Sequence, residues 1–156
     1  MFDSKDIKIL TILQESSRAT ASDIADRVEM SVPAVGERIK KLVDNRIIES
    51  FTAKLNAKAL GFDLSAYIAV VSSSSERYEE IIQKAIHQPA VLECHSVTGD
   101  GSHMLKVRVK NSTELERLLR DIQSWPGVIR THTSVIMSTY KEGYKLELTS
   151  NNKGNK

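Results

Sequence analysis

The run Gly99-Asp100-Gly101-Ser102-His103 has the residue types needed to bind a small molecule that carries both charges. Glycines allow several backbone N–H groups to converge on a carboxylate, and the Asp100 carboxylate can accept an ammonium group. The alternative is an ordinary hairpin turn, because glycine and aspartate mark turns with or without a ligand. We therefore treat this run as a candidate small-molecule site.

A second candidate stretch combines small residues with cations between Ser31 and Lys41. A helix in the major groove needs small outward side chains near its N-terminus, and basic side chains can contact phosphates. Gly36 costs a helix roughly 1 kcal/mol relative to alanine, and a purely structural helix gains nothing obvious from that cost. The predicted DNA-contacting residues are Ser31, Pro33, Ala34, Gly36, Glu37, Arg38, Lys40 and Lys41. The alternative is the solvated charged face of a common helical hairpin.

Three short helices are expected to position this stretch. Thr20 followed by Asp23 predicts one helix start, and Ser31 predicts the next. An earlier helix that begins after Asp3 or Ser4 has a broad apolar face that can cover the other two. The apolar side of the candidate DNA-reading helix consists of Val35, Ile39, Leu42 and Val43. Three helices within about 45 residues predict a tri-helical helix-turn-helix domain.

The next segments predict a domain boundary. Residues 47–55 are rich in β-prone types and predict either a wing of the DNA domain or a strand that pairs elsewhere. Residues 56–63, which include Gly61, predict a linker. The expected domains are therefore 1–55 and 64–148. Residues 149–156 are rich in Asn, Lys and Gly and are expected to be disordered.

The second half of the chain alternates strand and helix patterns. The expected strands are 64–72, 91–98, 103–110 and 128–140. One expected helix carries Tyr78 to Ile86, and another starts after Asn111 and ends at Pro126. This order is β-α-β-β-α-β, so the predicted fold class is α+β with a ferredoxin-like, ACT-like second domain. The first of these strands is apolar on both sides, so both faces of the sheet must be covered.

The composition excludes several classes of protein. The net charge of +2 over 156 residues is too small to identify a nucleic-acid binder, so attraction to DNA must come from local clustering. Cys94 is the single cysteine, which excludes an intrachain disulfide and zinc-finger spacing. The sequence shows no signal-like N-terminus and no apolar run long enough to span a membrane. We expect a soluble, cytoplasmic protein with no membrane contact.

Metal binding is not expected. His95, His103, His132 and Cys94 belong to the second domain, but they have neither helical His-x-x-x-His nor paired Cys-x-x-Cys spacing. Cys94 and His95 are neighbours in an expected strand, so their side chains point to opposite faces. We therefore predict no metal and no cofactor, and interpret Cys94 as a small buried residue.

Several segments, taken in order and spacing, resemble a known family. They are Asp6-Ile7-Lys8-Ile9-Leu10, Ser31 with Val35, Arg38-Ile39 and Leu42, Val91-Leu92-Glu93-Cys94-His95, Val97-Thr98-Gly99-Asp100, Leu105-Lys106-Val107-Arg108-Val109, and Pro126-Gly127-Val128. Over about residues 2–148 the chain is similar to the Lrp/AsnC (leucine-responsive, feast/famine) family of transcription regulators. No single one of these motifs is specific, but their order and spacing together are.

The resemblance implies a regulator that binds double-stranded DNA and responds to a small effector, often a free amino acid. It implies C-terminal domains that form dimers and higher ring-like assemblies, with an octamer as the expected larger form. It adds the facing strand, with Thr131, Thr133 and Ser134, to the effector site. Many members have an aromatic residue just after the Gly-Asp pair, where this chain has Gly101 and Ser102, which implies a more open or less selective pocket.

Two other functions stay open at this point. Some proteins of related architecture are tetrapyrrole (siroheme-type) decarboxylases, and Arg130, His103 and His132 are compatible with a carboxylate-rich substrate. The other open function is that of a stand-alone amino-acid-binding domain that does not bind DNA. The basic flank of the predicted DNA-reading helix disfavours both, so we expect a regulator that is not an enzyme.

Overall fold

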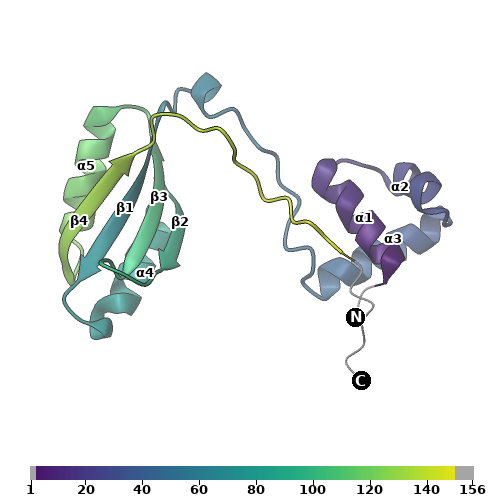
Figure 1. The fold of residues 1–156 in the computed structure, drawn as a ribbon, viewed down its shortest axis with the longest axis horizontal. Helices are drawn as coiled ribbons and strands as arrows, with labels where there is room; N and C mark the ends of the chain where they lie inside the picture. The colour runs from purple at the N-terminus through teal and green to yellow at the C-terminus, as the bar shows by residue number, and fades with distance from the viewer. Residues whose placement is uncertain (1–2, 150–156) are drawn as a thin grey trace. The chain divides into compact units, whose positions relative to one another are not determined.

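A computed structural model describes residues 3–149, which form two compact units (Figure 1). The first unit contains residues up to Lys54 together with the segment that starts at Glu142, and the second contains Leu55–Lys141. The sequence had assigned residues 142–148 to the second domain, whereas this segment contacts the first unit through bonds such as that between Gln14 and Leu146. Most of the tail expected to be disordered lies outside the described residues.

The first unit contains the three expected helices, α1 (Ser4–Glu15), α2 (Ala21–Val28) and α3 (Val32–Asp44). Each helix starts with the predicted kind of cap. The Asp3 and Thr20 side chains accept hydrogen bonds from the third residue of their helices, whose own carboxylates accept from the cap backbone. The Ser31 hydroxyl accepts from the backbone N–H of Ala34 at 3.4 Å. These caps satisfy N–H groups that have no partner inside a helix, so the helix starts are determined locally.

The helices bury one shared core. Its buried members are Ile9, Leu10, Ile12, Leu13, Ile24, Ala25, Val28, Val35 and Leu42. The expected apolar side of α3 is confirmed for Val35 and Leu42, and Ile39 is half-buried against the same core. Val43, by contrast, is 40% exposed, because it lies one residue beyond Leu42 and so points away from α1 and α2.

Within one chain, residues 47–55 form neither the predicted wing nor the predicted strand. The helix is followed by a turn with Arg46 at φ 56°, and within the described part of the chain no strand lies between Asp44, the end of α3, and Leu64. A strand requires a neighbour to complete its hydrogen bonds, and these residues pair with no other strand of the same chain. Ile47 and Phe51 are consequently about half exposed. The predicted linker contains one short 3-10 helix, Lys58–Leu60.

The second unit confirms the β-α-β-β-α-β order. It consists of β1 (Leu64–Ser72), α4 (Tyr78–His87), β2 (Val91–Ser96), β3 (His103–Val109), α5 (Ser112–Gln123) and β4 (Val128–Val135). The sheet order is β2-β3-β1-β4, and every neighbouring pair is antiparallel. β4 ends five residues before Tyr140, the predicted end of that strand, because its partner β1 begins at Leu64, only two residues beyond the pair Ala66–Val135.

Both helices of this unit cover the same face of the sheet (Figure 1). On β1, Ala66, Ile68 and Val70 are fully buried beneath them, while Tyr67 on the other face is 41% exposed. The prediction that both faces are covered therefore does not hold within one chain. We refer to the face that carries Tyr67 as the open face.

Candidate DNA-reading helix and effector turn

The outer side of α3 is exposed and carries the residues predicted to contact DNA. Gly36, Glu37, Lys40 and Lys41 are exposed, and no atom outside α3 lies within 4 Å of the position that a Cβ on Gly36 would take. Another surface can therefore approach this side of α3 closely. Lys40 has no ion pair within residues 3–149, so its ammonium group is available to a phosphate.

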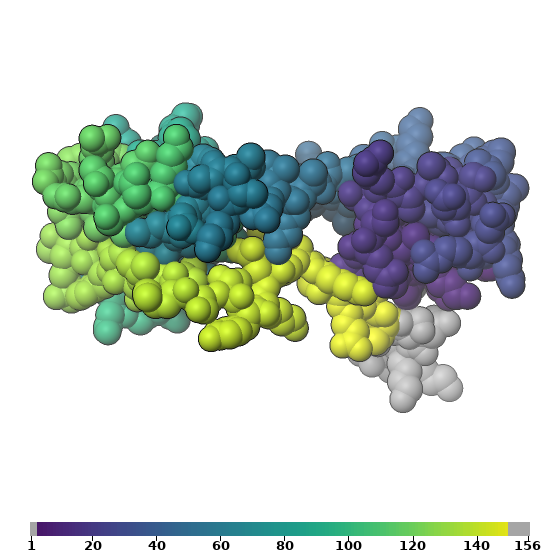
Figure 2. All heavy atoms as spheres, turned by 90° about the horizontal axis from the view of Figure 1, so that it is seen from above, coloured from purple at the N-terminus to yellow at the C-terminus, as the bar shows by residue number. Residues whose placement is uncertain are grey.

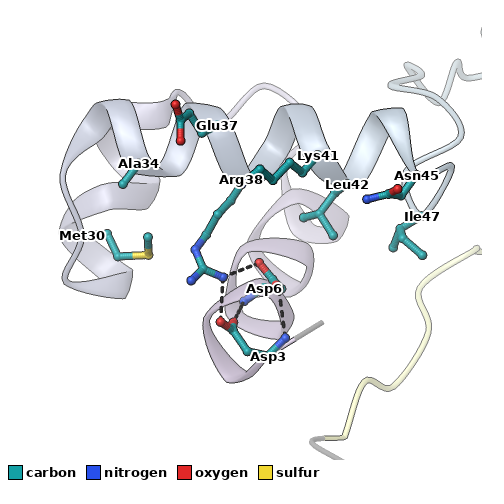
Figure 3. Close-up of a pocket in the computed structure, with 10 residues that line it drawn as sticks. All are labelled: Asp3, Asp6, Met30, Ala34, Glu37, Arg38, Lys41, Leu42, Asn45 and Ile47. Atoms are coloured by element: carbon teal, nitrogen blue, oxygen red, sulfur yellow. Dashed lines mark hydrogen bonds and ion pairs between the residues drawn. The ribbon is translucent and has the colours of Figure 1, made fainter. Parts of the chain in front are cut away.

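Arg38 lies at the flank of α3 and pairs with the start of α1. Its guanidinium contacts the Asp6 carboxylate at 2.7 Å and the Asp3 carboxylate at 2.8 Å (Figure 3). The hydrogen bond to Asp6, followed by that to Asp3, raises the pKa of Arg38 above its usual value. The pKa of Asp3 is lowered, first by the backbone N–H of Asp6 and then by Arg38. Arg38 thus ties α3 to α1, whereas the sequence had assigned it to the DNA contact alone.

Asp3 and Asp6 are functional neighbours that the sequence reasoning missed. Asp3 was interpreted only as part of a helix start, and a capping box between Asp3 and Asp6 is present. Their ion pairs with α3 require Arg38, which is 32 residues beyond Asp6 in the chain. Only the packing of α3 on α1 brings these groups together, so no local pattern could have indicated the pair.

A hollow of about 650 Å³ lies beside this ion pair (Figure 3). Its charged lining consists of the carboxylates Asp3, Asp6 and Glu37 and the cations Arg38 and Lys41. Three acids against two bases do not produce the positive field that a phosphate ligand requires. The hollow is therefore a weaker candidate for DNA contact than the exposed side around Gly36 and Lys40.

The predicted effector turn is bound tightly to β1. The backbone N–H of Ser102 donates to the Val70 carbonyl at 2.8 Å, and the Ser102 hydroxyl donates to the same oxygen at 3.1 Å. A Cβ on Gly101 would lie 3.3 Å from that oxygen, so glycine lets the turn approach the strand closely. Gly99 has a φ of 108°, a conformation that glycine adopts readily. One side of the turn is thus fixed to the sheet.

Asp100 is the exposed member of this turn. It makes no hydrogen bond or ion pair within residues 3–149, in contrast to Ser102 beside it. A carboxylate that is exposed and unpaired can accept an ammonium group without first breaking another ion pair. Asp100 is therefore available for the ammonium contact that the sequence predicted.

His103 lies beneath the turn, where the sequence had expected a ligand contact. It is fully buried, and its ring stands nearly perpendicular to the Tyr78 ring at a centroid distance of 4.9 Å. Its Nδ1 lies 2.9 Å from the Ser102 hydroxyl, while its Nε2 is buried without a hydrogen-bond partner. Burial lowers the pKa of His103, because the core disfavours the charged imidazole. His103 thus supports the turn from inside the core.

The three hydroxyl residues expected on β4 do not share one face. Thr131 pairs with Val70 and Thr133 with Ile68, so both point towards the helix-covered face. Ser134 pairs with Tyr67 and points to the open face. The Thr131 hydroxyl also accepts a hydrogen bond from Gln123 at the end of α5. The period of two along a strand is visible in the sequence and already separates Ser134 from the two threonines.

The metal candidates are likewise divided between two faces. Cys94 pairs with Leu105 on the helix-covered face, where burial raises the pKa of its thiol, and His95 pairs with Met104 on the open face. Within residues 3–149 no group of three or more His, Cys, Asp or Glu side chains is arranged to hold a metal ion.

Among residues 3–149, no helix has the length and apolar character needed to cross a membrane.

The chain matches two domain families along most of its length. The AsnC-type helix-turn-helix domain matches residues 2–43, and the Lrp/AsnC ligand binding domain matches residues 65–146. The HTH-type transcriptional regulator FL11 from Pyrococcus horikoshii is 35% identical over 146 residues, which cover 94% of this chain and 96% of the relative.

Two solved structures are similar over the same range. A transcriptional regulator from Neisseria meningitidis in complex with L-methionine has a TM-score of 0.89 and 27% identity, covering 94% of this chain and 97% of the other. The feast or famine regulatory protein from M. tuberculosis, complexed with L-methionine, has a TM-score of 0.88 and 30% identity, covering 94% of this chain and 99% of the other.

A helix-turn-helix unit followed by a ligand-binding α+β unit defines a DNA-binding regulator of transcription. The relatives named above are regulators too, and none of them is named as an enzyme. This chain belongs to the Lrp/AsnC family of transcriptional regulators.

Proposed function

We propose that this regulator binds a free amino acid at the turn of residues 99–102 and that its affinity for DNA responds to that ligand. The observation that carries this proposal is Asp100, an exposed carboxylate without an ion pair in the described chain, held on a turn whose neighbouring backbone is fixed to β1. Relatives solved with L-methionine support the same class of ligand.

The proposed contacts use both charges of the amino acid. The Asp100 carboxylate accepts the ammonium group, and backbone N–H groups of the glycine turn donate to the carboxylate. Ser134 can contribute a hydroxyl from the open face, whereas Thr131 and Thr133 face the helices and contribute only at the edge of the sheet. His103 acts indirectly, through the Ser102 hydroxyl.

We propose that some residues of α3 contact DNA phosphates and that others lie nearest the bases. Lys40 and Lys41 contact phosphates, while Pro33, Ala34, Gly36 and Glu37 lie nearest the bases. These four residues supply few hydrogen-bond donors, so the deformability of the DNA should contribute much of the specificity. Arg38 stays a predicted DNA contact, but its pairing with Asp3 and Asp6 supports a mainly positioning role.

We also propose a homodimer as the smallest active form, with assembly to a larger ring of up to eight chains. The open face supports this, because Tyr67 stays 41% exposed in one chain and Ala69 and Val71 on the same face of β1 are only partly buried. A dimer presents two DNA-reading helices, which a pair of half-sites requires. Deleting residues 1–62 should leave an oligomer in analytical sedimentation, and a monomeric fragment would contradict this assignment.

We infer no catalytic activity, and we infer a cytoplasmic location because the partner is DNA. The tetrapyrrole decarboxylase alternative would need His103 at the substrate, and burial of this side chain speaks against that. A titration with a porphyrin, followed by optical absorption, tests the alternative directly. A saturable spectral change would favour the enzyme.

Thermal-shift measurements with each of the twenty amino acids test the effector proposal. A ligand at 100 times its Kd should stabilise the folded protein by about 2.7 kcal/mol. Asp100→Ala should abolish the shift and any effect of the ligand on DNA affinity, with effector-free DNA affinity close to that of the wild type. Glu76→Ala is the control, since Glu76 is another exposed acid of the second unit. If Asp100→Ala weakens DNA binding without any ligand, the turn is structural.

A further inference from the structure

The C-terminal segment 142–149 lies against the first unit (Figure 2). The side-chain amide of Gln14 makes two hydrogen bonds to one residue of this segment. Its Oε1 accepts from the backbone N–H of Leu146 at 2.6 Å, and its Nε2 donates to the Leu146 carbonyl at 3.2 Å. Gln14 thus satisfies the backbone of an extended segment much as a neighbouring strand would.

Charge and apolar contacts surround this bidentate pair. The Lys145 ammonium lies 2.9 Å from the Glu15 carboxylate, which is the main reason that the pKa of Glu15 is lowered. Leu148 is partly buried against the core of the three helices. Polar recognition of the backbone and an ion pair therefore coincide at the last turn of α1, and Leu148 of the same segment packs on the core of the three helices.

The same segment also contacts the chain where it leaves the first unit. The Lys54 ammonium donates to the Glu142 carbonyl at 3.1 Å and lies 3.3 Å from the Glu142 carboxylate. The two chain connections between the units, which pass through Leu55 and Lys141, are therefore linked to each other at the edge of the first unit.

We propose that the last turn of α1 is a docking surface for segment 142–149 of the same chain, and that docking couples the effector turn to the DNA-reading helix. The coupling part rests on the effector function proposed above. β4 carries Ser134 and ends at Val135, and the backbone N–H of Ile136 donates to Ser65 at 2.9 Å. Only residues 137–141 then separate the sheet from the docked segment.

The contacts are suited to reversible docking. Lys145 and Glu15 keep 57% and 47% of their side-chain surface exposed, and exposed ion pairs contribute little net stability. Docked and released forms are then close enough in free energy for a ligand that favours one of them to shift the balance. Because α1 also holds Arg38 of α3, release of the segment acts on the helix that supports the DNA-reading helix.

The first measurement is hydrogen exchange of residues 142–149 in the full chain. Gln14→Ala combined with Lys145→Ala should raise the exchange rate of this segment to that of an unprotected chain, and Lys141→Ala should leave it unchanged. Lys141 is the matched control, because it is exposed and makes no hydrogen bond or ion pair with α1 within residues 3–149. Equally fast exchange in the wild type would overturn docking. Protection that depends on protein concentration would assign the docked segment to a second copy and overturn the intrachain proposal.

The second measurement is DNA affinity with and without L-methionine, or with whichever amino acid gives a thermal shift. In the wild type the ratio of the two Kd values should lie between about 5 and 150. In the double variant, and in a chain truncated after Lys141, the ratio should fall to about 1, while ligand binding persists in the thermal-shift assay. An unchanged ratio with a released segment would overturn the coupling.

These results separate the two proposals. A wild type that binds no amino acid contradicts the effector function and with it the coupling, whereas docking is still judged by exchange. A wild type that responds to the ligand, with variants that respond equally, contradicts only the coupling.

Discussion

Gly36→Ala should stabilise the first unit and weaken its binding to DNA. Gly36 lies within α3, and no atom outside the helix lies within 4 Å of the added Cβ. Alanine is favoured over glycine in a helix interior by about 0.8–1 kcal/mol, so the free energy of unfolding should rise by about that amount. For a unit of this size the melting temperature should rise by about 4–8 °C.

DNA binding should change in the opposite direction if bases or backbone approach α3 at this position. A methyl group forced into a tightly packed contact costs about 1–3 kcal/mol, which corresponds to roughly 5–150-fold weaker binding. Fluorescence anisotropy on a DNA duplex from the protein's own upstream region measures this loss, and urea unfolding of the same sample measures the stability. Higher stability with unchanged DNA affinity would refute the close approach at Gly36.

Further measurements test the other contacts. Lys40→Ala should reduce the slope of log K against log salt by about 0.9 for each bound DNA-reading helix, and an unchanged slope would remove Lys40 from the phosphate contacts. Because burial lowers the pKa of His103, this imidazole is protonated less readily in the folded protein than in the unfolded chain. The contribution of neutral His103 to the free energy of unfolding should be complete above about pH 6.5 and should be lost as the pH falls towards the pKa of the folded state. In urea titrations, His103→Phe should flatten this pH dependence. Gly127→Ala should lower the melting temperature more than Gly99→Ala. Both glycines have positive φ, but a Cβ at 127 would clash with the Arg77 side chain, whereas a Cβ at 99 would have no atom within 4 Å.

The local features of this protein follow from the sequence by itself. The caps at Thr20 and Ser31 involve residues within three positions of one another, so their chemistry can be read along the chain. The alternation in β3 and the helical spacing of Leu115, Leu118 and Ile122 likewise report which sides are buried. These signals were sufficient for the element order, the fold class and the glycine turn, because each depends on a repeat or a spacing inside one element.

Other predictions depend on a partner surface that the sequence does not name and that one chain does not supply. Residues 47–55 have the composition of a strand, but no strand of the same chain pairs with them. The open face at Tyr67 is likewise apolar, and no element of the same chain covers it within residues 3–149. Composition reports that a segment can pair or pack, and it does not report whether its own chain supplies the other side.

Only the tertiary structure decided the roles of several single residues. Arg38 belongs by its helical position to the DNA-reading side, yet two carboxylates of α1 hold it. His103 belongs by its position to the effector turn, yet it is buried against Tyr78. Gln14 meets Leu146 across 132 residues of chain. Such pairs form when separate elements pack together, so they depend on three-dimensional proximity, which spacing along a chain does not encode.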